Sequence, residues 1–350
     1  MGIGNLRHFD TRMTLWQLLA LEDAALEQAD VVLLNLCVAK GIPSLADLNI
    51  ARYVRVVDDW TQQFARVLPG MEANFRKTPE RWENDIRFFR IGMLQGFLGH
   101  EIGIRYIDEQ WGAKEVSYTN PGDLFLHGVI DTKQGTCANM AALHVAMARR
   151  MGWPVSLACV KSHFISRFDD GTVTHNIEAT SNHPGSFASG SDEDYIKKLG
   201  LPRKAIECGS DLRKLTAREM IGVFLSLRGR HYTDTGLPTE SDSSYALARV
   251  IFPLHRRAYI GAMAPMLARG ATLFNRGEVG HPDSLFQEVR PYLSLGPSHP
   301  LHSPFMGQSP PMTPARPVVV GSVVDVLEKA FGTPITKSLK PSQQQQGPQS

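Results

Sequence analysis

Residues 134–180 read QGTCANMAALHVAMARRMGWPVSLACVKSHFISRFDDGTVTHNIEAT, and this stretch decides the expected fold. Its first half has apolar residues at helical spacing over 138–151, and its second half alternates as two strands around Asp169-Asp170-Gly171. This order predicts a buried helix packed on a small antiparallel sheet. The chain is therefore expected to belong to the α+β class.

The thiol of Cys137 is the first candidate for chemistry. It directly precedes the predicted helix, so it lies in the first helical turn. Unpaired backbone amides and the positive end of the helix dipole in that turn favour a thiolate. A cysteine in an apolar segment is more often a small buried residue, and we keep that interpretation for Cys37, Cys159 and Cys208.

The Asp-Gly turn predicts a β-hairpin that brings two further candidates together. An Asp170-Gly171 loop pairs His163 with Glu178 and Ser166 with His175. Opposed residues on an antiparallel ladder have Cβ atoms roughly 5 Å apart, and an imidazole and a carboxylate can bridge that distance with a hydrogen bond. A three-residue loop would put His163 and Glu178 on opposite faces, so this prediction depends on the register.

Cys137, His163 and Glu178 then have the residue types of a nucleophile, its general base and the group that orients the base. Asn176 lies on the same predicted face as Glu178 and is the alternative orienting residue. Gln134 precedes the thiol by three residues and is a candidate for stabilising an oxyanion together with the Cys137 backbone amide. An exposed loop amide is the other interpretation of Gln134.

Four motifs carry a family resemblance: Gly135-Thr136-Cys137, 148–154, Ser162-His163-Phe164 and 176–180. Together they resemble the transglutaminase-like superfamily, a rearranged relative of the papain fold, in which Cys on a helix precedes His and an acid on successive strands. The sequence is similar to bacterial proteins of uncharacterised function that join a helical N-terminal region to such a core.

The resemblance implies that Cys137 is the nucleophile, His163 the base and Glu178 the counterpart of the Asp in animal transglutaminases. It implies a cysteine hydrolase or acyltransferase acting on an amide or peptide bond through a thioester, with a peptide or protein as substrate. The calcium-ligand clusters of animal transglutaminases are not found in the sequence, and neither a cofactor nor a metal is expected.

Two alternative functions use the same residues. In the first, the transglutaminase-like core is a catalytically silent scaffold, and residues 206–290 or the tail bind a protein partner. In the second, Cys137, His163 and Glu178 hold a metal ion, although no motif supplies a fourth ligand.

The rest of the chain divides into regions that differ in composition and in the spacing of apolar residues. In the N-terminal part, helices are expected from Ser44 or Asp47 through Leu68 and from Thr78-Pro79-Glu80 onward. The predicted regions are a helical N-terminal region over 1–110 and the transglutaminase-like core over 111–205. Residues 206–290 are expected to form a helical hairpin region, weakly similar to a tetratricopeptide unit, with helices over 221–232 and 245–266. Residues 291–350 are expected to be a disordered Pro/Gln-rich tail with a short helix over 319–331.

Composition limits the partners. The 37 basic and 35 acidic side chains give a net charge of +2, which leaves no surplus for binding nucleic acid. No apolar run approaches the roughly 20 residues of a membrane span. The N-terminal sequence lacks the basic and apolar regions of a signal peptide, so we expect a cytoplasmic protein without membrane association.

Overall fold

The computed structural model describes residues 9–107, 117–161, 163–180, 188–201, 203–259 and 261–262. Residues Met1–Ala258 form one compact unit and Tyr259–Ser350 another, and the features below belong to the first. The predicted tail and its helix over 319–331 lie outside the described residues. The predicted division of the chain into four regions stays a prediction.

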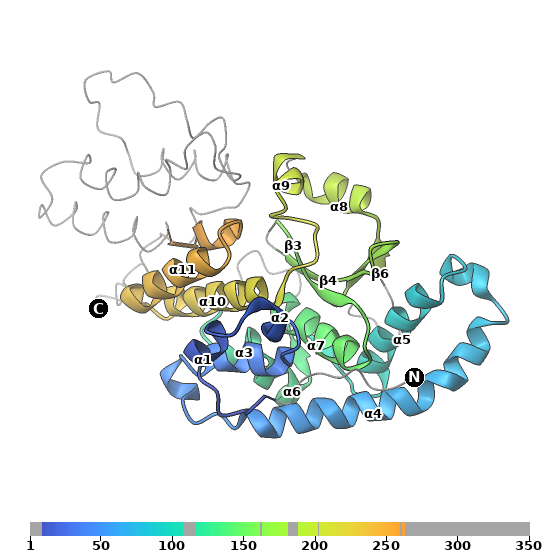
Figure 1. The fold of residues 1–350 in the computed structure, drawn as a ribbon, viewed down its shortest axis with the longest axis horizontal. Coiled ribbons are helices and arrows are strands. Elements are labelled where there is room, and N and C mark those ends of the chain that lie inside the picture. Colours follow the sequence, from blue (N-terminus) through green and yellow to red (C-terminus); the bar gives the residue numbers. More distant parts are fainter. Residues whose placement is uncertain are drawn as a thin grey trace, which may run out of the picture. The chain divides into compact units, whose positions relative to one another are not determined.

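Helices account for most of the described elements, and a small sheet lies among them (Figure 1). The α-helices are α1 (Leu15–Leu19), α2 (Asp23–Leu26), α3 (Val31–Ala39), α4 (Ile50–Phe75), α5 (Ile86–His100), α6 (Leu126–Thr132), α7 (Cys137–Arg150), α8 (Asp192–Leu199), α9 (Arg203–Glu207), α10 (Ala217–Asp234) and α11 (Pro238–Ile251). The 3₁₀ turns are η1 (Pro43–Leu45), η2 (Pro79–Trp82) and η4 (Pro121–Asp123).

Strands β3 (Val155–Val160), β4 (His163–Asp169), β5 (Thr174–Glu178) and β6 (Ala188–Gly190) form an antiparallel sheet in sequence order. Strands β1 (Arg105–Tyr106) and β2 (Gln134–Gly135) form a short parallel pair. Many helices beside a small antiparallel sheet agree with the predicted α+β class. Within the described ranges, no helix combines the length and apolar character that a membrane span requires.

Helix α7 is the centre of this unit. It contacts strands β3 and β4 of the sheet and also helices α3, α4, α5 and α6. Its side chains are almost all buried, including Leu143, Val145 and Met147 on different sides of the helix. A helix that is buried all round is held by packing on several faces rather than by one amphipathic stripe. The position of Cys137 at its first residue is therefore fixed by the surrounding core.

The helix expected from Thr78-Pro79-Glu80 onward begins later than predicted. Thr78-Pro79 opens only the 3₁₀ turn η2, which ends because Glu83 and Asn84 adopt φ of 54° and 56°. Helix α5 starts instead after Asp85, whose carboxylate accepts a hydrogen bond from the Arg87 backbone amide. The N-cap at Asp85 was missed because the Thr-Pro pair seven residues earlier has the same capping signature.

The helical hairpin near the end of the unit is formed by α10 and α11, which contact each other extensively. Pro238 lies between the two predicted helices, over 221–232 and 245–266, and occupies the first turn of α11, where its missing amide proton costs nothing. The predicted helix over 245–266 therefore begins earlier, and α11 ends at Ile251.

The β4–β5 hairpin has a register shifted by two residues from the prediction. Ser166 pairs with Ile177 rather than with His175, and Asp169 pairs with Thr174. The loop therefore centres on Gly171-Thr172, where Gly171 has φ of +83°. A shift of two residues keeps every side chain on its predicted face, because side chains alternate with a period of two. The predicted direct pairing of His163 with Glu178 is wrong, yet the two residues still share a face.

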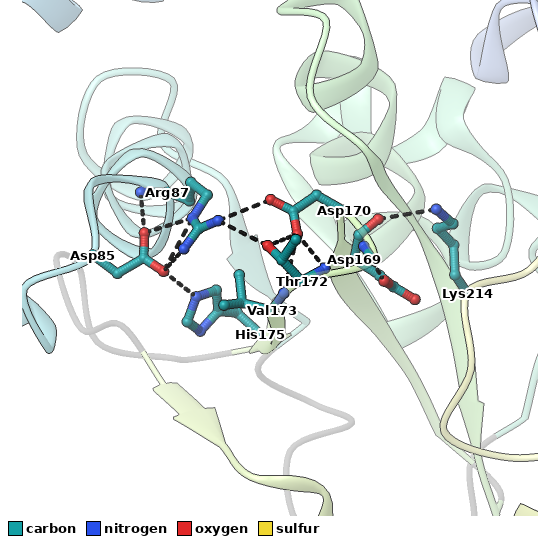
Figure 2. A network of polar contacts seen from close by, with 9 residues as sticks. Asp85, Arg87, Asp169, Asp170, Thr172, Val173, His175 and Lys214 are labelled. Carbon is teal, nitrogen blue, oxygen red and sulfur yellow. Dashed lines mark hydrogen bonds and ion pairs between the residues drawn. The ribbon is translucent and has the colours of Figure 1, made fainter.

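Polar contacts around the turn explain the register (Figure 2). The Asp170 carboxylate accepts hydrogen bonds from the backbone amides of Thr172 and Val173, at 2.9 and 3.0 Å, so Asp170 closes the loop instead of occupying its centre. The Arg87 guanidinium of α5 bridges Asp85 and Asp170. On the other side of the loop, the Lys214 ammonium donates to the Asp169 carbonyl oxygen at 2.9 Å.

Replacing Gly171 by alanine tests the turn. A Cβ atom there meets nothing within 4 Å, so the only expected cost is the left-handed backbone, about 1 kcal/mol of unfolding free energy. The matched control is Gly96→Ala in α5, which also meets nothing within 4 Å but should stabilise the helix by about 1 kcal/mol. Urea unfolding measures both, and equal effects of the two substitutions would contradict the proposed turn.

Candidate active site at Cys137

The start of α7 is held by a capping box. Thr136 is the N-cap, its hydroxyl accepts from the Ala138 amide, and its own amide donates to the Asn139 side chain at 2.8 Å. The Thr136 hydroxyl donates to the Asp123 carbonyl, and the Asn139 amide group donates to the Gly122 carbonyl. These bonds fix the loop before α7 and leave the Cys137 amide in the first turn, where it has no intrahelical acceptor.

His163 lies between the thiol and a carboxylate. Its Nε2 atom is 2.7 Å from Glu178 Oε2, and on the thiol side His163 lowers the pKa of Cys137 by its charge and by hydrogen bonding. Because Nε2 is taken by Glu178, Nδ1 is the nitrogen left to face the thiol. The other carboxylate oxygen, Oε1, accepts from the Thr180 amide at 3.1 Å and from the Thr180 hydroxyl. The structure therefore brings together Cys137, His163 and Glu178, with His163 hydrogen-bonded to the carboxylate and acting on the thiol.

The charges of these groups stabilise one another. Burial alone would raise the pKa of the Cys137 thiol, but the charge and hydrogen bond of His163 and the charge of Arg257 lower it below its ordinary value. Burial would likewise lower the pKa of His163, yet Cys137 and Glu178 raise it to about 10. The pKa of Glu178 is lowered against the effect of burial by His163 and Thr180. This arrangement favours a thiolate–imidazolium pair.

Asn176 and Gln134 have other contacts. The Asn176 side chain is buried, accepts from Arg167 at 2.6 Å and donates to Asp192 at 2.7 Å. It is therefore engaged at the β5–β6 side of the sheet rather than at His163. The Gln134 side-chain oxygen, with the amide oriented to satisfy its neighbours, accepts from the Arg105 guanidinium at 2.6 Å. Its NH₂ group is the end that Arg105 does not engage.

With this geometry established, the chain can be compared with known proteins. Residues 57–208 match the family model of the transglutaminase-like superfamily. The chain contains a transglutaminase-like superfamily domain. The matched range begins inside α4 and ends just after α9, so it includes α5 as well as the sheet and α7. Members of this superfamily are typically cysteine-dependent enzymes.

Two further comparisons add little. No curated protein matches the sequence. Among solved structures, a crystal structure of menin, described as revealing the binding site for Mixed Lineage Leukemia (MLL) protein, is similar with a TM-score of 0.24 and 12% sequence identity. That alignment covers 81% of this chain and 88% of the menin chain.

A second Cys–His contact, between Cys159 of the matched range and His255 beyond it, has opposite properties. Cys159 Sγ lies 3.9 Å from His255 Nδ1, and the His255 Nε2 atom is 2.7 Å from the Ser226 hydroxyl. Burial raises the pKa of Cys159 and lowers that of His255 to about 3. Both groups are therefore neutral near pH 7. Burial also raises the pKa of Cys37, to about 12.

Three residues near the thiol carry no motif and were missed in the sequence. The charge of Cys137 contributes, after burial, to the raised pKa values of Tyr106 and Tyr118, so both phenols stay protonated. Arg257 lies beyond the matched domain in sequence, yet its charge acts on Cys137. Tyr118 alone among them stands beside a recognisable sequence feature, the turn-forming residues Asn120-Pro121-Gly122. In the described ranges, no cluster of His, Cys, Asp or Glu is arranged to hold a metal ion.

The pH dependence of alkylation tests the ion pair. In the wild-type protein, the rate at which iodoacetamide modifies Cys137 should rise with pH around a midpoint below the ordinary thiol pKa, because the imidazolium stabilises the thiolate. His163→Ala removes that charge while burial remains, so the midpoint should move to higher pH and the rate at pH 7 should fall on the order of tenfold. Peptide mapping by mass spectrometry measures the rate at each cysteine.

His175→Ala is the matched control for that substitution. His175 is also paired with a carboxylate, at 3.1 Å from Asp85, and lies on the same hairpin but on the other face. Its replacement should leave the alkylation profile of Cys137 unchanged. Equal shifts in the two variants would mean that the shift reflects damage to the hairpin rather than loss of the ion pair.

Proposed function

We propose that this protein is a cysteine-dependent hydrolase or acyltransferase that acts on amide or peptide bonds. The observation that carries the proposal is the chain of contacts from the Cys137 thiol through His163 to Glu178, with 2.7 Å between the last two. Cys137 is partly exposed, as a group that meets a substrate must be. In this proposal Cys137 is the nucleophile, His163 the acid and base, and Glu178 the residue that orients His163.

The first half of the reaction breaks the amide bond. The Cys137 thiolate attacks the carbonyl carbon, an S–C bond forms, and the carbonyl π electrons move to oxygen. As the tetrahedral intermediate collapses, the C–N bond breaks and the His163 imidazolium donates its proton to the leaving nitrogen. The products are an amine and a thioester on Cys137.

The second half resolves the thioester. Neutral His163 takes a proton from water, or from an acceptor amine, as that nucleophile attacks the thioester carbon. The S–C bond breaks, and a carboxylic acid or a new amide leaves. The thiolate and the imidazolium are restored, so hydrolysis and acyl transfer differ only in the acceptor.

Two donors are suited to the oxyanion of the tetrahedral intermediate. The Cys137 backbone amide lies in the first turn of α7, at the positive end of the helix dipole. The NH₂ group of Gln134 is the second, because Arg105 engages only the oxygen of that side chain. The first donor belongs to the nucleophile residue itself, and Gln134 precedes it by three residues.

Charge on Glu178 matters to this mechanism because the carboxylate stabilises the imidazolium. Glu178→Gln keeps an oxygen that accepts a hydrogen bond from His163 but removes the charge. Its rate of thioester formation should therefore fall, although less than in His163→Ala, where loss of the acid–base group lowers the rate by about 10²- to 10⁴-fold.

Intact-mass spectrometry measures this rate as a covalent acyl adduct after mixing the protein with an amino-acid thioester or a peptide-amide library. Cys137→Ala gives the background, and Cys159→Ala is the matched control that should retain the adduct. Equal acylation of the Cys137→Ala variant and the wild type would favour the scaffold interpretation over the enzyme.

A further inference from the structure

Arg257 lies over the ring of Phe164, a residue whose backbone acts on the Cys137 thiol. Its guanidinium carbon is 5.2 Å from the centre of the Phe164 ring. Phe164 follows His163 directly in β4, and both its backbone amide and the charge of Arg257 lower the pKa of the Cys137 thiol. The cation over this ring therefore lies beside the strand residues that act on the thiol.

The chain on the N-terminal side of Arg257 is held firmly. The buried His255 ring is hydrogen-bonded to Ser226 of α10 and stacks on Phe252. Arg256 forms an ion pair with the buried Asp211 carboxylate at 3.5 Å. Asp211 also accepts from the Lys161 backbone amide at the turn before β4. These contacts connect the segment before Arg257 to the strand that carries His163.

Arg257 itself has no acidic partner among the described residues. In contrast, Arg167 is paired with Asp192, Arg213 with Glu219, and Arg150 with both Asp30 and Asp58. Arg257 is partly exposed, and its guanidinium lies over the Phe164 ring. A guanidinium that lies over an aromatic ring keeps its N–H groups at the edge, in the planar fork that binds carboxylates in a bidentate manner.

We propose that Arg257 determines specificity by binding a carboxylate of the substrate, so that the site prefers acyl groups with a negative charge near the scissile carbonyl. This inference rests on the proposed function of Cys137 as a nucleophile. It adds a substrate class to that function, and it uses a residue outside the range matched by the family model.

Two alkylating reagents with the same chemistry separate this role from a general effect on the thiol. Iodoacetate carries a carboxylate, whereas iodoacetamide is neutral. Loss of Arg257 changes the thiolate fraction of Cys137 equally for both reagents, so the ratio of their rates at Cys137 isolates attraction of the carboxylate. Arg257→Gln should lower the iodoacetate-to-iodoacetamide ratio by roughly three- to tenfold, and Arg257→Lys should retain most of it.

Arg203→Gln is the control for net charge. Arg203 is paired with Glu207 on an exposed helix and its side chain is 92% exposed, so its replacement should leave the ratio unchanged. Circular dichroism of each variant establishes that it is folded, and the Lys and Gln variants give two independent readings of the charge at position 257.

The outcomes separate this inference from the function on which it rests. If Cys137 reacts rapidly with iodoacetamide but the ratio is the same in the wild type and both Arg257 variants, the specificity role is overturned and the nucleophile stands. If Cys137 reacts no faster than Cys208 with either reagent in the wild type, the nucleophile hypothesis fails, and the specificity role fails with it. A ratio that falls in Arg257→Gln but not in Arg257→Lys or Arg203→Gln supports both the nucleophile role of Cys137 and the specificity role of Arg257.

Discussion

The contact between His163 and Glu178 is the interaction on which the candidate site depends. Burial opposes the charge of both groups and of Cys137, yet the pKa of each is shifted toward its charged form because the three groups interact. A buried charge is tolerated only when it is paired and its remaining hydrogen bonds are satisfied. Glu178 meets this condition because one of its oxygens binds His163 and the other binds Thr180. The Cys137 thiolate is then the third charged group, next to an imidazolium whose own charge is balanced by Glu178.

This dependence explains what the sequence could predict about the site. His163 and Glu178 share a face in any register that differs from the predicted one by an even number of residues, because side chains alternate along a strand. The prediction therefore survived a shift of two residues. The position of Cys137 in the first turn of α7 was also readable, because the capping residue and the apolar helix are adjacent in sequence. Local chemistry was sufficient for both.

Features that depend on distant residues could not be predicted in this way. The register of the β4–β5 hairpin is set partly by Arg87, which lies on α5 more than eighty residues before the turn. Asn176 was the alternative to Glu178 in the sequence because it lies on the same predicted face, and only the contacts with Arg167 and Asp192 show that its side chain is occupied. Arg257 has no motif at all, because its relevance comes from its position over Phe164.

The two Cys–His contacts show why residue types alone do not define a thiol site. Cys159 and His255 are in contact, but the second nitrogen of His255 meets the neutral hydroxyl of Ser226, which gives an imidazolium no compensating charge. Burial then keeps both groups neutral. At Cys137 the corresponding nitrogen of His163 meets a carboxylate, and the pKa of the imidazole moves in the opposite direction. The group behind the imidazole, rather than the Cys–His contact, decides whether the thiol is activated.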